Sequence, residues 1–461
     1  MVFSSITFLY YFLPLFFIIY IFAPSKYKNA VLLAASLVFY AWGEPVYVLL
    51  MVFSTVFNYF CGIYIEKSEY LKSKRAIAAF GIAVNVCMLF FFKYADFAIQ
   101  TVNTMFGAKI KSLNLALPIG ISFYTFQTMS YIIDVYRGDV CAQRNFTDFA
   151  AYVTMFPQLI AGPIVRYSSI EEQLSKRKVK SKDITDGALR FCIGLAKKVL
   201  IANNIGELWN FAYQKSMSGA SVMTFWLGVL AYALQIYYDF SGYSDMAIGL
   251  GKILGFKFPE NFKYPYISSS VSEFWRRWHI TLGTWFKEYV YFPLGGSRGG
   301  IKRTVINLIV VWFLTGLWHG ASCNFVIWGL YYGVLLILEK FVWKTFLKNH
   351  KKTGYIYTLL AVCIGWVFFA SGNLTLAFNY LLKMIGIGTK GFADGEFLYN
   401  VSSNALLLII AAAGCTPLFK NICKRYIKSD YIKIAFSVLL IILCTAYLIN
   451  STYNPFLYFR F

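Results

Sequence analysis

Residues 46–65 read VYVLLMVFSTVFNYFCGIYI, twenty consecutive positions without a charged side chain. As an α-helix, a segment of this length spans about 30 Å, the thickness of the hydrocarbon core of a bilayer. The strict alternation of polar and apolar residues expected of a strand in a membrane barrel is absent from it. The stretch therefore predicts a transmembrane helix.

Similar apolar runs recur along the whole chain. Hydrophobic residues make up 59% of the 461 positions and charged residues 14%, which is unlike a soluble domain. Some runs are short enough to be broken, tilted or re-entrant. We therefore expect an all-α polytopic membrane protein with about eleven to thirteen transmembrane or re-entrant helices. The other runs lie at residues 6–22, 30–42, 76–92, 115–133, 149–165, 223–238, 305–317, 325–338, 355–370, 405–415 and 434–448.

The chain is strongly basic, with 43 Lys and Arg against 21 Asp and Glu and a formal charge of +22. The basic residues gather in short loops between apolar runs, so we expect contact with membrane lipid and not with nucleic acid. By the positive-inside rule these loops face the cytoplasm of a bacterial inner membrane. Counting helices outward from Lys26 places the N-terminus on the extracytoplasmic side.

Cysteine and histidine usage argues against a metal site. The nine cysteines show no C-x-x-C pairing, and the three histidines, His279, His319 and His350, are too few and too scattered for a histidine-rich site. Neither a linker nor a repeat divides the chain, so residues 1–461 are predicted to form a single membrane domain.

The region from about 237 to 333 differs from the rest because charged residues lie among its aromatic residues and glycines. Charge at membrane depth is costly and usually has a partner or a function. We therefore expect the chemistry here. The residues concerned are Asp239, Asp245, Glu260, Glu273, Arg276, Arg277, His279, Lys287, Glu288, Arg298 and His319.

Residues 273–287 read EFWRRWHITLGTWFK, which is typical of an interfacial helix with Trp275, Trp278 and Trp285 at the level of the lipid headgroups. Its cations have two interpretations. Arg276, Arg277 and Lys287 either contact anionic lipid or bind a phosphate-bearing cofactor, because arginine recognises phosphate in bidentate fashion.

His319 ends the run at residues 305–317 in the stretch LTGLWHGA (314–321). A neutral imidazole accepts a proton, as a general base must. Gly316 and Gly320 leave room for a substrate or for another backbone. The alternative is a structural histidine hydrogen-bonded between helices.

Asp239 and Asp245 lie in YDFSGYSD (238–245), where Ser241 and Gly242 are expected to interrupt a helix. Six residues apart, the two carboxylates would not share one helix face, so they are not a paired dyad. Either one orients a histidine, or it caps the end of a half-helix.

Several motifs together resemble the membrane-bound O-acyltransferase (MBOAT) family, and within it the bacterial alginate and peptidoglycan O-acetyltransferases. Both ends of the chain share the likeness, which therefore covers nearly all of it. The motifs are WRRWH (275–279), TWFKEY (284–289), PLGG (293–296), GLWHGA (316–321), YDFSGYSD (238–245), PQLIAGP (157–163), MVFSS (1–5) and YNPFLYFRF (453–461).

The resemblance implies helices around a central tunnel and acyl transfer from cytosolic acetyl-CoA to an extracytoplasmic hydroxyl. It implies His319 as the catalytic base and His279 as a second catalytic residue that orients the donor or stabilises the oxyanion. Trp275, Arg276, Arg277 and Lys287 would bind the cofactor. Asp239, Asp245 and Trp318 would line the tunnel or orient other groups.

The resemblance also implies a secreted SGNH-type partner that completes acetylation of peptidoglycan or an alginate-type polysaccharide, and the short chain favours peptidoglycan slightly. Three other functions stay open from the sequence: D-alanyl transfer to teichoic acid, transport, and a structural role in an export complex. The absence of an internal repeat argues against a transporter.

Overall fold

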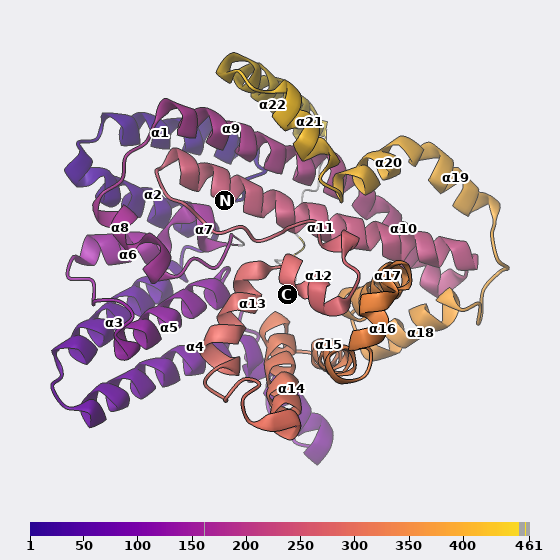
Figure 1. Ribbon diagram of the computed structural model, residues 1–461, viewed down its shortest axis with the longest axis horizontal. Coiled ribbons are helices and arrows are strands. Elements are labelled where there is room, and N and C mark those ends of the chain that lie inside the picture. Colours follow the sequence, from indigo (N-terminus) through magenta and orange to yellow (C-terminus); the bar gives the residue numbers. More distant parts are fainter. Residues whose placement is uncertain (161, 451–456, 458–461) are drawn as a thin grey trace. The chain divides into compact units, whose positions relative to one another are not determined.

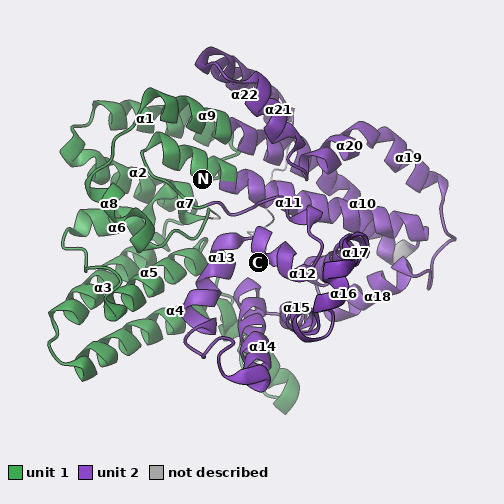
Figure 2. Ribbon diagram, viewed as in Figure 1, with its two compact units in different colours: residues 1–191, 245–259 green, residues 192–244, 260–461 purple. Residues whose placement is uncertain are grey.

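The computed structural model describes residues 1–160, 162–450 and 457, and the regular structure of these residues is helical, without a strand (Figure 1). The all-α prediction is therefore confirmed. The chain forms two compact units, each assembled from separate stretches (Figure 2). Unit 1 contains residues 1–191 and 245–259, and unit 2 contains residues 192–244 and 260–461. A single functional domain over 1–461 stays a prediction.

Unit 1 is built from the first helices of the chain. They are the π-helical segment η1 (Phe8–Phe12), α1 (Leu13–Phe22), the 3-10 turn η2 (Ser25–Tyr27), α2 (Lys28–Gly43), α3 (Val48–Lys67), α4 (Leu71–Phe106), α5 (Ile121–Arg137), α6 (Phe146–Thr154), α7 (Phe156–Leu159), α8 (Tyr167–Ser175) and most of α9 (Ser181–Ala196).

Unit 2 contains most of the region in which chemistry is expected, except residues 245–259. Its elements are η3 (Lys197–Ala202), α10 (Asn203–Ser218), most of α11 (Val222–Ile253), η4 (Pro265–Ile267), α12 (Val271–Arg277), α13 (Ile280–Phe286), η5 (Lys287–Tyr291), α14 (Gly300–His319), α15 (Cys323–Phe341), α16 (Lys344–Asn349), α17 (Lys351–Ala370), α18 (Leu374–Met384), α19 (Gly395–Ser403), α20 (Ala405–Gly414), α21 (Leu418–Tyr426) and α22 (Asp430–Asn450).

Every one of the twelve apolar runs contains helix. Within the part of the chain that the structure describes, six helices are long and apolar enough to cross a membrane: α3, α4, α14, α15, α17 and α22. The bent pair of α19 and α20 makes a seventh if it counts as one span. Other runs are shorter or broken, as at residues 149–165, where α6 and α7 are separate helices. The chain is thus a multi-pass membrane protein.

The interruption predicted at Ser241 and Gly242 is wrong, because α11 runs through both residues without a break. Gly242 has a different purpose. A Cβ atom at this position would lie 2.7 Å from the main-chain oxygen of Gly194 in α9. The glycine therefore allows two helices to touch, and it does not end one.

In unit 1, α3, α4 and α5 pack together around buried amides. Asn58 and Asn85 exchange hydrogen bonds of 2.7 and 3.3 Å, and Thr128 donates to Oδ1 of Asn85 at 3.2 Å. Polar contacts of this kind link membrane helices without leaving donors or acceptors in hydrocarbon.

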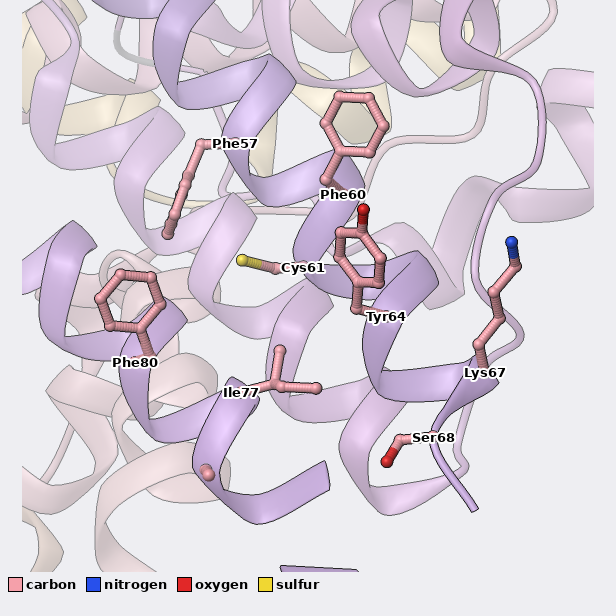
Figure 3. A pocket seen from close by; sticks show the side chains of 9 residues that line it. Phe57, Phe60, Cys61, Tyr64, Lys67, Ser68, Ile77 and Phe80 are labelled. Carbon is pink, nitrogen blue, oxygen red and sulfur yellow. The ribbon is translucent and has the colours of Figure 1, made fainter. Parts of the chain in front are cut away.

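An apolar groove of about 780 Å³ lies between α3 and α4 (Figure 3). Its walls are mostly aromatic and aliphatic side chains, including Phe57, Phe60 and Phe80, with Lys67 and Ser68 at one end. Both helices are candidate membrane spans.

Two of the motifs that suggested the family lie partly outside the described residues. In PQLIAGP (157–163) residue 161 is not described, and in YNPFLYFRF (453–461) only Leu457 is described.

Candidate active site

His319 is the last residue of α14, and its imidazole is buried against aromatic rings. Its ring centre lies 4.9 Å from that of Trp328 on α15 and 5.1 Å from that of Phe369 on α17, both nearly edge to face. Such a wall excludes water from the imidazole and restricts its rotation.

Close contact between α14 and α15 fixes the end of α14. A Cβ atom on Gly316 would lie 2.3 Å from the main-chain oxygen of Phe325, and one on Gly329 would lie 2.3 Å from that of Trp312. No side chain fits at either point. The room expected beside His319 is therefore taken at Gly316 by another backbone, one of the two alternatives that the sequence left open.

His279 lies between α12 and α13 in the left-handed conformation, with φ 43° and ψ 53°. This region is unfavourable for a residue with a side chain and is occupied where surrounding contacts hold it. The imidazole is buried, and Phe240 of α11 packs edge-on against it at 4.7 Å. Residues 273–287 are thus two short helices with a sharp turn at His279, and the prediction of a single interfacial helix is wrong.

Asn261 holds this turn through its main chain and its side chain. Its main-chain oxygen accepts the N–H of Ile280 at 3.0 Å. Its Oδ1 atom lies 3.1 Å from Nδ1 of His279 and accepts from the N–H and hydroxyl of Thr281 at 3.2 and 2.9 Å. Burial lowers the pKa of His279 to about 3, so the imidazole is neutral at physiological pH.

Trp318 connects the two histidines. Its indole centre lies 5.9 Å from the imidazole of His279 and 4.9 Å from that of its neighbour His319. The structure therefore brings the two predicted catalytic histidines to one aromatic cluster in unit 2, although one precedes α13 and the other ends α14.

Glu339 on α15 anchors α12, a role that the sequence did not predict. Its buried carboxylate accepts the main-chain N–H groups of Val271 and Ser272 at 2.6 and 2.8 Å and the Ser272 hydroxyl at 2.5 Å. A negative charge at a helix N-terminus is stabilising. Ser270 also caps the helix by accepting the N–H of Glu273 at 3.0 Å. Together they set the path of the chain toward His279.

The three predicted cofactor-binding cations differ in their surroundings. Arg276 and Lys287 are exposed, and the Lys287 ammonium lies 5.4 Å from the Phe292 ring. Arg277 forms an ion pair with Glu273 at 2.7 Å. Arg276 and Lys287 thus present charge outward, whereas the Arg277 charge is partly neutralised.

Of the three tryptophans expected at the headgroups, two are buried and Trp275 is half-buried. Trp278 and Trp285 are buried. The ring centre of Trp275 lies 4.9 Å from that of Trp312 and 4.9 Å from that of Tyr332. The rings of Trp312 and Tyr332 are 5.6 Å apart. The indoles thus pack against other aromatic rings of the protein, and their depth in the membrane stays a prediction.

Asp239 and Asp245 both lie inside α11 and bind different cations. Asp239 pairs with Lys198 at 2.6 Å, with both side chains almost fully buried, and accepts the N–H of Leu457 at 2.8 Å. Asp245, in unit 1, binds Arg190 at 2.8 and 3.0 Å. The two carboxylates do not form a paired dyad, as the sequence predicted. Neither of them caps a helix end. Their assignment to the tunnel or to orientation stays a prediction.

Among the described residues no group of three His, Cys, Asp or Glu side chains is placed to hold a metal ion. His350 is exposed and takes no part in the aromatic cluster.

Comparison with known proteins assigns the family. The model of the membrane-bound O-acyltransferase family matches residues 141–382, which include both buried histidines. The chain belongs to the MBOAT family. It is therefore an acyltransferase.

Relatives of this MBOAT protein have related activities by name. It is 44% identical to "Probable alginate O-acetylase AlgI" of Azotobacter vinelandii over 89% of this chain and 83% of that one. It is 34% identical to the peptidoglycan O-acetyltransferase of Helicobacter pylori over 100% of this chain and 98% of that one. A teichoic acid D-alanyltransferase of Bacillus subtilis is 29% identical over 56% of this chain and 68% of that one.

Proposed function

We propose that this MBOAT protein moves acetyl groups from cytosolic acetyl-CoA across the inner membrane for O-acetylation of an extracytoplasmic polysaccharide. The single observation on which the proposal depends is the convergence of His319 and His279 on Trp318 inside unit 2. The names of the most similar relatives, alginate and peptidoglycan O-acetyltransferases, support the acetyl group and the polymer.

His319 acts as the general base. Its imidazole takes the proton of the acceptor hydroxyl as the oxygen attacks the thioester carbonyl, a task usually worth about 10²- to 10⁴-fold in rate. The new C–O ester bond forms, the C–S bond breaks, and the proton returns from His319 to the departing thiolate. The aromatic wall of Trp328 and Phe369 keeps water, a competing nucleophile, away.

His279 binds and orients the substrate beside this base, while Arg276 and Lys287 attract the phosphates of the donor from the cytosolic side. Both cations are exposed and lie near the turn at His279 in the sequence. Exposed cations steer an anionic ligand mainly by raising its association rate, and salt weakens that effect. Arg277, paired with Glu273, contributes less.

Transfer of the acetyl group to its acceptor takes place outside the cytoplasm. We place the N-terminus on the extracytoplasmic side and the basic loops in the cytoplasm, according to the positive-inside rule. A secreted or membrane-anchored SGNH-type protein then passes the acetyl group to the polymer. The higher identity to alginate O-acetylases favours an alginate-type polymer over peptidoglycan.

The test uses the purified protein in liposomes with radiolabelled acetyl-CoA on the side of the basic loops. An SGNH-type acetyltransferase and an oligosaccharide acceptor are supplied on the other side. We expect label on the acceptor and none with a His319→Gln variant. A matched reaction supplies D-alanine on a carrier protein, since a D-alanyltransferase is among the relatives. Transfer of D-alanine without transfer of acetyl would overturn the proposal.

A further inference from the structure

The hydrogen bonds around Asn261 determine which nitrogen of His279 carries the proton. Three groups surround Oδ1 of Asn261: the N–H and hydroxyl of Thr281 and Nδ1 of His279. The side chain is fully buried, so water does not compete for these contacts.

The orientation of the Asn261 amide follows from Thr281. A main-chain N–H group can only donate, so the atom 3.2 Å from it must be the amide oxygen and not the amide nitrogen. An amide oxygen can only accept, so Nδ1 of His279, 3.1 Å away, must carry a hydrogen. A neutral imidazole has one such hydrogen. Nε2 of His279 therefore carries no hydrogen and can only accept a hydrogen bond.

Nε2 is the atom left for a ligand. It is buried, and it has no hydrogen-bond partner within residues 1–160, 162–450 and 457. A buried acceptor without a partner is unfavourable and needs an explanation, of which a bound substrate is one. Nδ2 of Asn261 is buried and without a partner in the same part of the chain. The pair thus offers a substrate one acceptor and one donor.

We propose that Asn261 is a positioning residue that holds His279 in the tautomer with hydrogen on Nδ1, so that Nε2 accepts a hydrogen bond from an N–H or O–H group of a bound substrate. The identity of that substrate as acyl donor or acyl acceptor rests on the proposed function, whereas the tautomer does not. His279 in this form cannot donate to an oxyanion, so its task is orientation.

Two features support the assignment. The left-handed backbone at His279 is unfavourable, and the contacts of Asn261 with residues 279–281 are in place to hold it. Burial keeps the imidazole neutral, because it lowers the pKa of His279 to about 3. The tautomer therefore persists across the working pH range.

The tautomer is measured by nitrogen NMR of protein labelled with ¹⁵N-histidine in lipid. Three histidines give few signals, and a His279→Gln variant identifies the pair from His279. We expect a protonated Nδ1 and an unprotonated Nε2 at pH 7.5. A protonated Nε2 would overturn the proposal, whether or not the protein transfers acetyl groups.

Variants of Asn261 test the positioning role. Asn261→Leu should mix or reverse the tautomers, whereas Asn261→Asp, whose carboxylate oxygens also accept from Nδ1, should retain the hydrogen on Nδ1. The matched control is Asn307→Leu, since Asn307 is also buried in unit 2 and donates to main-chain oxygens of Leu294 and Gly296. An unchanged His279 signal in folded Asn261→Leu would contradict the role. If that variant does not fold, the wild-type tautomer still decides.

Kinetics identify the substrate. Removing a partner of a buried polar group lowers kcat/KM by about 5- to 150-fold. In Asn261→Leu, a rise in KM for acetyl-CoA alone would assign Nε2 to the donor, and a rise for the acceptor alone would assign it to the acceptor. Unchanged kinetics in a variant with altered tautomers would refute a substrate contact. Wild-type protein with the expected tautomer but no acetyl transfer would overturn only the proposed function.

Discussion

The indole of Trp318 lies 5.9 Å from the imidazole of His279, ring centre to ring centre, at 66° between the ring planes. Because Trp318 also precedes His319 and contacts its ring, one side chain touches both candidate catalytic groups. The distance between α13 and the end of α14 is thereby fixed by a rigid aromatic side chain.

Removal of this indole should misplace both imidazoles. Trp318→Ala is expected to lower kcat/KM for acetyl transfer by at least about tenfold, because the cavity frees both rings to rotate. Trp318→Phe, which keeps an aromatic ring, should lose less. Steady-state rates of acetyl transfer in liposomes measure the loss in both variants. The control is Trp226→Phe, since the Trp226 indole lies elsewhere and donates to the main-chain oxygen of Met384. Equal rates for Trp318→Ala and wild type would refute the role.

Contact between α14 and α15 should tolerate no added methyl group. Gly316→Ala places a Cβ 2.3 Å from the Phe325 oxygen, so α14 must shift and take His319 with it. We expect both a lower melting temperature and slower acetyl transfer. Gly372→Ala is the control, because nothing lies within 4 Å of its Cβ position. If the two variants behave alike, the close packing does not position His319.

The buried pair of Lys198 and Asp239 should be strongly sensitive to removal of one partner. Lys198→Met leaves a buried carboxylate without this cation, a change that typically costs about 3–5 kcal/mol. Adding Asp239→Asn removes the charge but keeps an acceptor for the Leu457 N–H, so most stability should return. Denaturant unfolding in detergent measures the difference.

The comparison for that experiment is a more exposed pair, Lys215 and Glu396, 2.7 Å apart. Lys215→Met should cost no more than about 1 kcal/mol. A double variant as unstable as Lys198→Met alone would show that the charge of Asp239 is not the cause.

Stability should fall in acid because of His279. Burial lowers its pKa to about 3 in the folded protein, whereas the unfolded chain has the ordinary value near 6.5. Below about pH 6.5 the unfolded state binds a proton that the folded state does not, so stability decreases down to about pH 3. Melting temperatures across this range should fall less steeply in His279→Gln, while the exposed His350→Gln retains the wild-type slope.

The sequence predicted the helical membrane fold because its signals are local, and it singled out both histidines, whose catalytic roles stay a prediction. The length of an apolar run such as 46–65 is enough to predict a membrane span, and His319 lies at the end of another such run. The resemblance then supplied the acyl transfer. The same local signals failed at residues 273–287, where helical spacing gave no sign that His279 adopts a left-handed turn.

Other features depend on contacts between distant residues. Asn261 lies eighteen positions before His279, and Glu339 lies sixty-eight after Val271, so their hydrogen bonds have no pattern in sequence. Gly242 was predicted to interrupt a helix because the residue type alone does not distinguish a glycine that ends a helix from one that allows two helices to touch. Only packing distinguishes them.

The most direct test of the account is single-turnover acetyl transfer by wild-type, His319→Gln and His350→Gln proteins in liposomes loaded with an SGNH-type acetyltransferase and an oligosaccharide acceptor. If His319 is the base, His319→Gln should slow transfer by about 10²- to 10⁴-fold, with its melting temperature and insertion retained. His350→Gln should match the wild type. Transfer by His319→Gln at the wild-type rate would contradict the account.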